Sequence, residues 1–238
     1  MTFALIIPLA NEANNLDALV SRLSIQLNNN VIDAVYFVVD NASKDDTYKL
    51  CKKYSNADSR FISVWGEENK NAIDAYMLGY KTAFEDGNDY FIEMDGGLSH
   101  DPAALSSFKR ALLGGNECAF GSRFINGGSI QNSRYSRLFL SKFGTFVSNI
   151  ILGMHFKDGT SGFIGMNREI LSLIIKQGIK SKSHFYQTEL RFLLRKRKYI
   201  EIPIHYSSPS NSVSTGSIKD SIKLLFRMLL LRFRNFEL

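Results

Sequence analysis

The sequence predicts one α/β domain built on a mostly parallel sheet with helices on both faces. Three observations lead to this prediction: short apolar runs alternate with stretches of helical periodicity, these runs have no polar face, and polar or glycine-rich segments follow several of them. Strands that are apolar on both faces need cover on both sides, as in parallel sheets. A chain of 238 residues is long enough for such a domain with a substantial core.

The first half of the chain gives the clearest alternation of strand and helix. Residues 3–8 form an apolar run that ends at a proline, after which leucine and valine recur at helical spacing up to residue 27. The same pattern then repeats. The expected strands are 35–40, 61–65, 90–95 and 117–121, and the expected helices are about 45–54 and 71–85.

The second half is less regular. Its expected elements are a helix at 136–152, a glycine-rich segment at 158–165, helices near 168–176 and 186–197, and a strand at 199–206. After a loop rich in serine and asparagine, we expect an amphipathic C-terminal helix that carries Lys219, Lys223, Arg227 and Arg234 on one stripe. We therefore divide the chain into a main domain, 1–216, and a basic helix, 217–238. Two interpretations of this helix stay open: it packs on the core, or it lies in a membrane interface.

Charge and cysteine content limit the function classes. The net charge of +6 is concentrated towards the C-terminus, which suits an anionic partner such as nucleic acid or an anionic membrane surface. The cations do not interleave with aromatic residues as in nucleic-acid-binding modules, so we do not expect nucleic acid. The two cysteines lie far apart, which favours buried apolar roles in a reducing, cytoplasmic compartment. We expect neither a signal peptide nor a membrane-spanning segment.

The candidate site lies along the carboxyl edge of the predicted sheet, where ligands bind in such folds. The sequence turns polar there, at 8–12, 40–46, 95–100 and 121–123. Neither a GxGxxG fingerprint nor a GxxxxGK[ST] loop occurs, so the usual dinucleotide and P-loop interpretations lose their support. Asp40 ends a strand and can accept hydrogen bonds from a base or a ribose. Helix capping and turn formation, which Asn41, Ser43 and Asp45 would serve equally well, are the alternative.

Four segments carry a family resemblance. They are IIPLANEANNL (6–16), VVDNASKDDT (38–47), EMDGGLSHDP (93–102) and GSRFINGG (121–128). In this order, each at a strand end, they resemble the family 2 glycosyltransferases, specifically the polyprenyl-phosphate (dolichol-phosphate mannose type) sugar synthases. TSGF (160–163) and the run at 185–204 agree, so the resemblance covers residues 3 to about 206. It implies a Rossmann-like, nucleotide-sugar-binding domain of the GT-A type with hexosyltransferase activity.

The resemblance implies a donor site for a nucleoside diphosphate sugar. Its expected binding residues are Pro8, Asn11, Glu12, Asp40, Asn41, Ser43, Asp95 and Gly96. Asp95 matches the first carboxylate of the family's Asp-X-Asp motif, which helps hold a divalent metal on the diphosphate. Here the second carboxylate position is Gly97, and Ser99 stands where some relatives have an amide. We therefore expect Mg²⁺ or Mn²⁺ to be weakly held by Asp95, the donor phosphates and water.

Glu93 and His100 lie close to Asp95 in the sequence and are further candidate site residues. Glu93 shares its side of the strand but lies two residues back from the edge, so we do not expect it to replace the missing ligand. For His100 two roles stay open, a phosphate contact or a hydrogen-bonded loop histidine. No second histidine or cysteine lies nearby in the sequence, so zinc is not expected.

The resemblance also implies an acceptor site. Arg123 in GSRF and Arg137, with Arg134 as a competitor, match two arginines that face the acceptor phosphate in the family. The planar guanidinium fork suits phosphate oxygens. A lipid phosphate has a second pKa of about 6 and attacks the anomeric carbon without a dedicated base. We assign the catalytic roles to Asp95, Arg123 and Arg137 in a single inverting displacement.

The expected function is transfer of a sugar to a polyprenyl phosphate at the cytoplasmic face of the membrane, in cell-envelope glycan synthesis. GDP-mannose is the donor that the resemblance favours. One departure is the loop 206–217, which has no cation before Lys219, whereas the family usually places an arginine and a Gly-Ser-Lys-like segment there. Two alternatives are kept: a sugar-to-sugar transferase in surface polysaccharide assembly, whose general base we cannot identify, and a catalytically silent nucleotide-sugar-binding protein. The sequence does not predict the oligomeric state.

Overall fold

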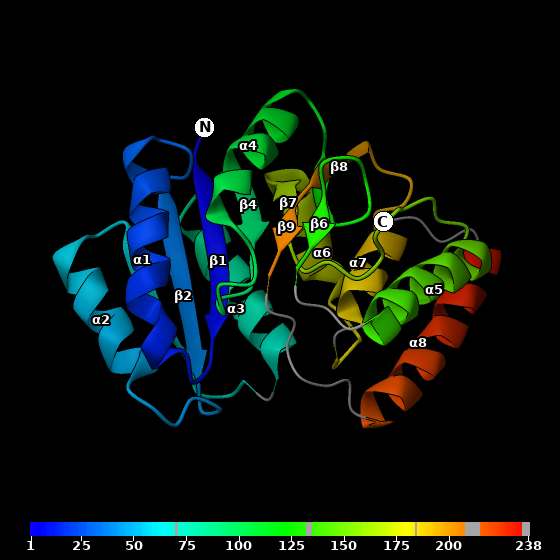
Figure 1. Ribbon diagram of the computed structural model, residues 1–238, viewed down its shortest axis with the longest axis horizontal. Helices are drawn as coiled ribbons and strands as arrows, with labels where there is room; N and C mark the ends of the chain where they lie inside the picture. Colours follow the sequence, from blue (N-terminus) through cyan, green and yellow to red (C-terminus); the bar gives the residue numbers. More distant parts are fainter. Residues whose placement is uncertain (70, 132–134, 184, 208–214, 235–238) are drawn as a thin grey trace.

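A seven-stranded sheet runs through the middle of the protein, and helices cover both of its faces (Figure 1). We describe it from a computed structural model that covers residues 1–69, 71–131, 135–183, 185–207 and 215–234. Within these ranges, only the backbone is described for residues 136, 137 and 215–220. The predicted α/β class is confirmed.

The strand order of the large sheet is β3-β2-β1-β4-β7-β5-β8. Its strands are β1 (Phe3–Leu9), β2 (Ala34–Asp40), β3 (Phe61–Gly66), β4 (Tyr90–Glu93), β5 (Cys118–Ser122), β7 (Ile164–Asn167) and β8 (Tyr199–Pro203). Neighbouring strands are parallel except at β7, which is antiparallel to both β4 and β5. A second small sheet pairs β6 (Ser129–Ile130) with β9 (His205–Tyr206). The sheet is therefore mostly parallel, as predicted.

Two cores lie on the two faces of the sheet. Strand β1 shows why, because Phe3, Leu5 and Ile7 belong to one core while Ala4 and Ile6 belong to the other. Helices α1 (Ala13–Asn28), α2 (Thr47–Ala57) and α4 (Leu105–Leu113) pack on the first face. Helices α3 (Ala72–Glu85), α6 (Arg168–Gln177) and α7 (Tyr186–Leu193) pack on the second.

Polar side chains begin several of these elements. Asn71 accepts hydrogen bonds from the backbone N–H groups of Ile73 and Asp74 at the start of α3. Asn167 does the same for Ile170 in α6. Asp101 accepts from Ala103 at a short 3₁₀ turn, η1 (Pro102–Ala104), that leads into α4. The first turn of this helical segment is therefore a 3₁₀ turn.

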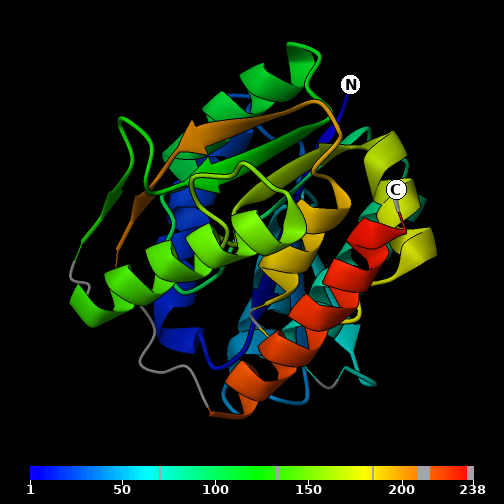
Figure 2. The same ribbon diagram turned by 90° about the vertical axis from the view of Figure 1, so that its right-hand side faces the viewer.

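Helices α5 (Tyr135–Leu152) and α8 (Thr215–Phe233) lie side by side at the end of the molecule farthest from α2 (Figures 1 and 2). The guanidinium group of Arg232 donates to the carbonyl oxygens of Ile150 and Ile151, at 2.8 and 2.7 Å. These bonds fasten the last turn of α5 to α8. No helix in the described part of the chain is long and apolar enough to cross a membrane.

Some boundaries differ from the prediction. The expected strand 199–206 is split between two sheets, because Ile204 passes from β8 to β9 and its carbonyl accepts from the N–H of Ser129. The helix expected at 186–197 ends at Leu193. The sequence did not predict β6, which has two residues, or β7, which begins inside the glycine-rich segment 158–165.

Candidate active site

The loops after β1 and β2 are joined into one surface at the carboxyl edge of the sheet. The N–H of Asn11 donates to the hydroxyl of Ser43 at 3.0 Å, and the Asn11 side chain accepts from the N–H of Lys44 at 2.8 Å. The N–H of Glu12 donates to Thr47 Oγ1 at 2.9 Å. Asn11 has φ 57°, in the left-handed region that asparagine tolerates better than most residues. Three predicted donor residues, Asn11, Glu12 and Ser43, thus lie together.

Asp45 fastens these two loops. Its carboxylate accepts from the hydroxyl of Thr47 at 2.6 Å and from the N–H groups of Thr47 and Ala13 at 3.1 and 3.0 Å. The hydrogen bond from the Thr47 hydroxyl is the main cause that lowers the pKa of Asp45 to about 2. Asp45 was weighed in the sequence only as a capping or turn residue, and that is the role it has here.

Asp40 and Asn41 follow β2 at the same edge. Asp40 is 6% exposed, and its Oδ1 accepts from the N–H of Ala42 at 2.9 Å, which is a turn-forming contact. Asn41 donates to the carbonyl of Glu67 at 2.8 Å. Trp65 of β3 lies nearby, because the next residue, Gly66, pairs with Asp40 across the two strands. Trp65 is 38% exposed. The role of Asp40 towards a nucleotide stays a prediction.

Asp95 lies two residues beyond the end of β4, with a side chain that is 40% exposed. The hydroxyl of Tyr76, from α3, donates to Asp95 Oδ1 at 2.9 Å. Gly96 packs so tightly against Leu9 and the carbonyl of Pro8 that a side chain has no room there. Asp95 and Gly96 therefore lie directly beside the predicted donor residue Pro8.

Glu93, the last residue of β4, lies two residues before Asp95 and is buried in the core. It is fully buried and accepts hydrogen bonds from the hydroxyls of Tyr80 at 2.7 Å and Tyr186 at 3.2 Å. Removal from water raises the pKa of Glu93 to about 8. At neutral pH Glu93 is mostly protonated and points into the core, which agrees with the expectation that it does not replace the missing metal ligand.

The contact between Tyr76 and Asp95 predicts a specific loss. Tyr76→Phe removes a donor to a charged acceptor, a contact worth about 1.5–3 kcal/mol, so we expect turnover to fall by about tenfold or more. The matched control is Tyr36→Phe, whose hydroxyl bonds to Asp86 and Asn88 at 2.8 and 3.0 Å at the opposite edge of the sheet. Steady-state kinetics and thermal melts of both variants test this. Equal turnover in Tyr76→Phe and the unchanged protein would show that the hydroxyl does not position Asp95.

Glu12 occupies the space beside the missing second carboxylate. A Cβ atom at Gly97 would lie 3.1 Å from Glu12 Oε1, while Glu12 Oε2 accepts from the side chain of Asn15 at 2.7 Å. Among the described residues no group of three or more histidine, cysteine, aspartate or glutamate side chains is arranged to hold a metal. The half-exposed Asp95 fits the mode in which Mg²⁺ binds through one carboxylate, with phosphates and water as its other ligands.

His100 is buried between the rings of Phe163 and Tyr206, with centroid distances of 5.2 and 5.1 Å. Neither of its nitrogens has a hydrogen-bond partner among the described residues, and Nδ1 lies 3.6 Å from Asp95 Oδ2. Burial lowers the pKa of His100, which keeps the ring neutral. Both roles of His100, a phosphate contact and a hydrogen-bonded loop histidine, therefore stay predictions.

Arg123 follows β5 directly and is held by a buried carboxylate. Its Nε and Nη2 each donate to Asp158 at 2.7 Å, and Nη2 also donates to the hydroxyls of Thr160 at 2.6 Å and Ser141 at 3.3 Å. Burial alone would raise the pKa of Asp158, but the hydrogen bonds from Arg123 hold it below its usual value. The guanidinium also lies over the Tyr206 ring, at 5.5 Å.

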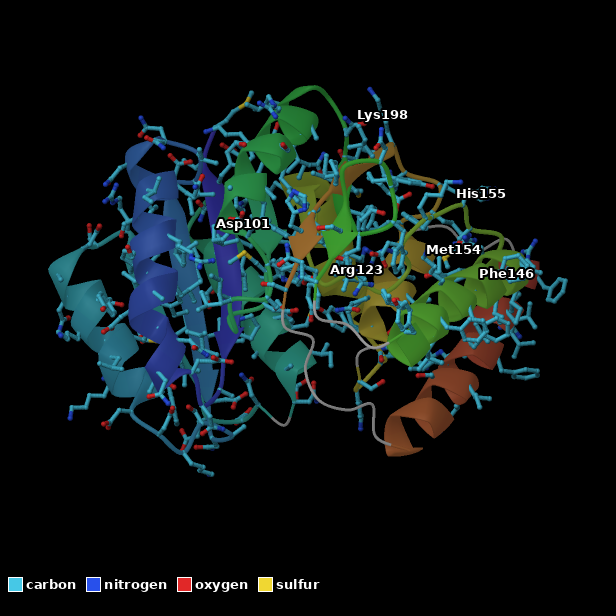
Figure 3. All side chains as sticks on the ribbon, in the orientation of Figure 1. Asp101, Arg123, Phe146, Met154, His155 and Lys198 are labelled. Atoms are coloured by element: carbon cyan, nitrogen blue, oxygen red, sulfur yellow. The ribbon has the colours of Figure 1, made fainter. Side chains whose placement is uncertain are left out.

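The remaining nitrogen of Arg123, Nη1, has no hydrogen-bond partner in the described part of the chain. One edge of an oriented guanidinium is thus left for a phosphate oxygen. Figure 3 labels Arg123 near the middle of the molecule, beside α5. Arg137 lies in the first turn of α5, and its side chain is outside the described residues, as are the side chain of Lys219 and all of Arg134.

The segment 160–163 lies next to both Asp95 and Arg123. With its amide in the orientation that satisfies both neighbours, Gln187 donates to the carbonyl of Thr160 and accepts from the N–H of Gly162 at 3.2 Å. A Cβ atom at Gly162 would lie 3.3 Å from Asp95 Oδ1. Thr160 in turn holds Arg123, so the loop connects the two predicted catalytic residues. The sequence analysis missed Asp158, Ser141 and Gln187 as site residues.

Comparisons with known proteins agree on one family and one fold. Residues 4–174 match the model of the Glycosyl transferase family 2. The polyprenol monophosphomannose synthase of Mycolicibacterium smegmatis is 30% identical over 94% of this chain and 84% of that protein. The UDP-N-acetylglucosamine–dolichyl-phosphate N-acetylglucosaminyltransferase of Methanococcus voltae is 25% identical over 96% of this chain and 95% of that protein.

A solved structure gives the same fold at lower identity. Glucosyl-3-phosphoglycerate synthase from Mycobacterium tuberculosis, in complex with Mn²⁺, uridine diphosphate and glucosyl-3-phosphoglycerate, matches with a TM-score of 0.66 and 13% identity. The match covers 97% of this chain and 79% of that one. This similarity supports the GT-A-like architecture and leaves the substrates open.

Proposed function

This chain belongs to glycosyl transferase family 2 and is a glycosyltransferase, and we propose that it transfers a sugar from a nucleoside diphosphate sugar to a polyprenyl phosphate. The observation that carries the acceptor proposal is the guanidinium of Arg123, which Asp158 and Thr160 orient with one nitrogen left over. The segment 160–163 connects it to Asp95, because Thr160 accepts a hydrogen bond from Arg123 and Gly162 lies next to Asp95. Donor and acceptor groups can therefore meet between these two side chains.

The donor side is the surface formed by the loops after β1, β2 and β4. In this proposal Asp40 and Asn41 contact the nucleoside, Pro8, Asn11, Glu12, Ser43 and Gly96 line the same surface, and Asp95 faces the diphosphate. A divalent cation on Asp95 would neutralise charge that develops on the departing nucleoside diphosphate. Tyr76 keeps the Asp95 carboxylate in place, and Glu93, two residues earlier, is itself held by the hydroxyls of Tyr80 and Tyr186.

The acceptor side needs no general base in this proposal. A lipid phosphate is largely ionised at neutral pH because its second pKa is about 6, so its oxygen attacks the anomeric carbon directly. Arg123 Nη1 binds one phosphate oxygen and turns another towards the sugar, with Arg137 as the expected second cation. A single displacement of this kind inverts the anomeric configuration, and its acceleration comes from positioning and charge stabilisation.

GDP-mannose is the donor we propose. Mannose as the transferred sugar is supported by two relatives, a polyprenol monophosphomannose synthase and a dolichol-phosphate mannosyltransferase. Another relative is named for UDP-N-acetylglucosamine, which makes that sugar the main competitor. We place the reaction at the cytoplasmic face of the membrane, where a nucleotide sugar and a lipid-bound acceptor meet.

A substrate screen tests the proposed function. Nucleotide sugars are incubated with a short polyprenyl phosphate, with and without Mg²⁺ or Mn²⁺, and lipid-linked sugar is measured by mass spectrometry. We expect product with GDP-mannose, in a reaction that the cation stimulates. Product with a saccharide acceptor, and none with polyprenyl phosphate, would instead establish a sugar-to-sugar transferase.

A further inference from the structure

Two neighbouring helices expose an unusually apolar surface, which we call the α5–α8 face. On α5 its members are Tyr135, Phe139, Phe143, Phe146 and Ile150, which are 51–92% exposed. On α8 they are Ile222, Phe226, Leu230 and Phe233, which are 49–77% exposed. At about 100° per residue, each set falls within roughly 80° of its helix circumference. The two stripes are therefore continuous rather than scattered.

Both helices pack on the protein through the side opposite to this exposed face. The opposite side of α5 supplies the buried residues Thr145, Ser148 and Leu152, and α8 supplies Leu224 and Met228. Figure 2 shows both helices on the side of the molecule that faces the viewer. In Figure 3 Phe146 lies on α5 towards the right-hand edge, away from the sheet. Soluble monomers rarely leave so large an apolar surface without a partner.

The charges around this surface are almost all positive. The sequence of α5 holds Arg137 and Lys142 and no acidic residue, while α8 holds four cations and the single acid Asp220. Lys142, Lys223 and Arg227 are exposed beside the apolar stripes. A cationic border around aromatic and aliphatic side chains is complementary to the head groups and acyl chains of an anionic bilayer.

The α5 helix also connects this face to the candidate site. Ser141, on the inner side of α5, accepts from Arg123 Nη2 at 3.3 Å, and it is two residues from both Phe139 and Phe143 on the outer side. Lys142 lies over the ring of Phe124, which also contacts Arg123. If α5 lies on a membrane, Arg123 is thus held close to the level of the lipid phosphates.

We infer that the α5–α8 face docks the enzyme on an anionic phospholipid bilayer, with the aromatic side chains of α5 as the main inserted anchor. The membrane contact is therefore made by two helices, whereas the sequence pointed only to the terminal one. A second copy of the chain fits this face poorly, because a two-fold dimer would set the same cations against each other. The inference deepens the proposed function, since it says how a lipid acceptor reaches Arg123.

Vesicle flotation of the full chain tests this inference without any substrate. Vesicles of phosphatidylglycerol with phosphatidylethanolamine are compared with phosphatidylcholine vesicles. We expect binding to the anionic vesicles that weakens as salt is raised, and a loss of at least tenfold in the double variant Phe143→Ser/Phe146→Ser. The matched control is Ile25→Ser/Leu113→Ser, at residues that are 56% and 48% exposed on α1 and α4, and it should bind within twofold of the unchanged protein. Thermal melts confirm that both variants fold.

Three results would overturn the inference: no binding of the unchanged protein to anionic vesicles, equal loss in both double variants, or a stable dimer in analytical ultracentrifugation that only Phe143→Ser/Phe146→Ser dissociates. Transfer assays separate this inference from the proposed function. The double variant Phe143→Ser/Phe146→Ser should keep its activity on a short, water-soluble polyprenyl phosphate. Its activity on a long polyprenyl phosphate embedded in vesicles should fall by at least tenfold. Vesicle binding by a protein that glycosylates no polyprenyl phosphate would uphold the docking face and overturn the proposed function.

Discussion

Arg123→Ala is expected to lower transfer to polyprenyl phosphate by a factor of about 10² to 10³, the loss typical for one oriented charge-stabilising donor. Binding of the nucleotide sugar should change little, because the donor loops lie after β1, β2 and β4. The variant should also be less stable, since it leaves the fully buried Asp158 without its partner. Breaking a buried ion pair on one side costs about 3–5 kcal/mol.

A double variant separates these two effects. In Arg123→Ala/Asp158→Asn the buried negative charge is gone, so we expect the folding free energy to recover most of the loss while transfer stays abolished. Chemical denaturation gives the stability, and product formation gives the activity. If transfer returned together with stability, Arg123 would be a structural residue and the acceptor site would have to be sought elsewhere.

Asp95→Ala is expected to weaken binding of the donor and to leave binding of the acceptor unchanged, the reverse of Arg123→Ala. It should weaken binding of the nucleotide sugar by at least about tenfold, one carboxylate contact to the metal-diphosphate being worth about 1.4 kcal/mol or more, and should remove most of the stimulation by Mg²⁺. Binding of a short polyprenyl phosphate should persist. Calorimetric titration measures both ligands, and Trp65, the single tryptophan, gives an independent fluorescence signal at the carboxyl end of β3.

Asp89→Asn is the control for Asp95→Ala. Asp89 precedes β4 at the opposite edge of the sheet, where it accepts from the N–H of Thr2 at 2.8 Å. Its substitution should leave donor binding and turnover unchanged. Unaltered donor affinity in Asp95→Ala would remove Asp95 from the donor site, whatever the result for Arg123.

Local sequence patterns predicted most strands of the large sheet, because strand ends and helix starts are marked by nearby residues. They could not predict the partner of Arg123, since Asp158 lies 35 residues further along the chain and meets it only in the folded protein. They also could not predict which side of α5 is buried. Its apolar stripe would by itself be assigned to the core, whereas the structure exposes that stripe and buries the side that carries Thr145 and Ser148.

Gly97 shows the same limit within the site. The comparison with the family's Asp-X-Asp motif indicates that Gly97 replaces a carboxylate, so that one metal ligand is missing. In the structure the carboxylate of Glu12 already lies beside it. An aspartate at position 97 would bring two negative groups together, so the two positions are coupled and a change at one is best tested with a change at the other.

The antiparallel strand β7 sets an order for assembling the enzyme. Of the described strands, β7 alone joins the two parts of the large sheet, because it pairs with β4 on one side and with β5 on the other. A growing chain can pair β1 to β4 as soon as residue 93 has emerged, but β5 has no place in the sheet until residues 164–167 are made. During synthesis the part of the sheet from β3 to β4, which carries the proposed donor loops, can therefore form before the part that holds Arg123, and β5 joins it only after β7 is made.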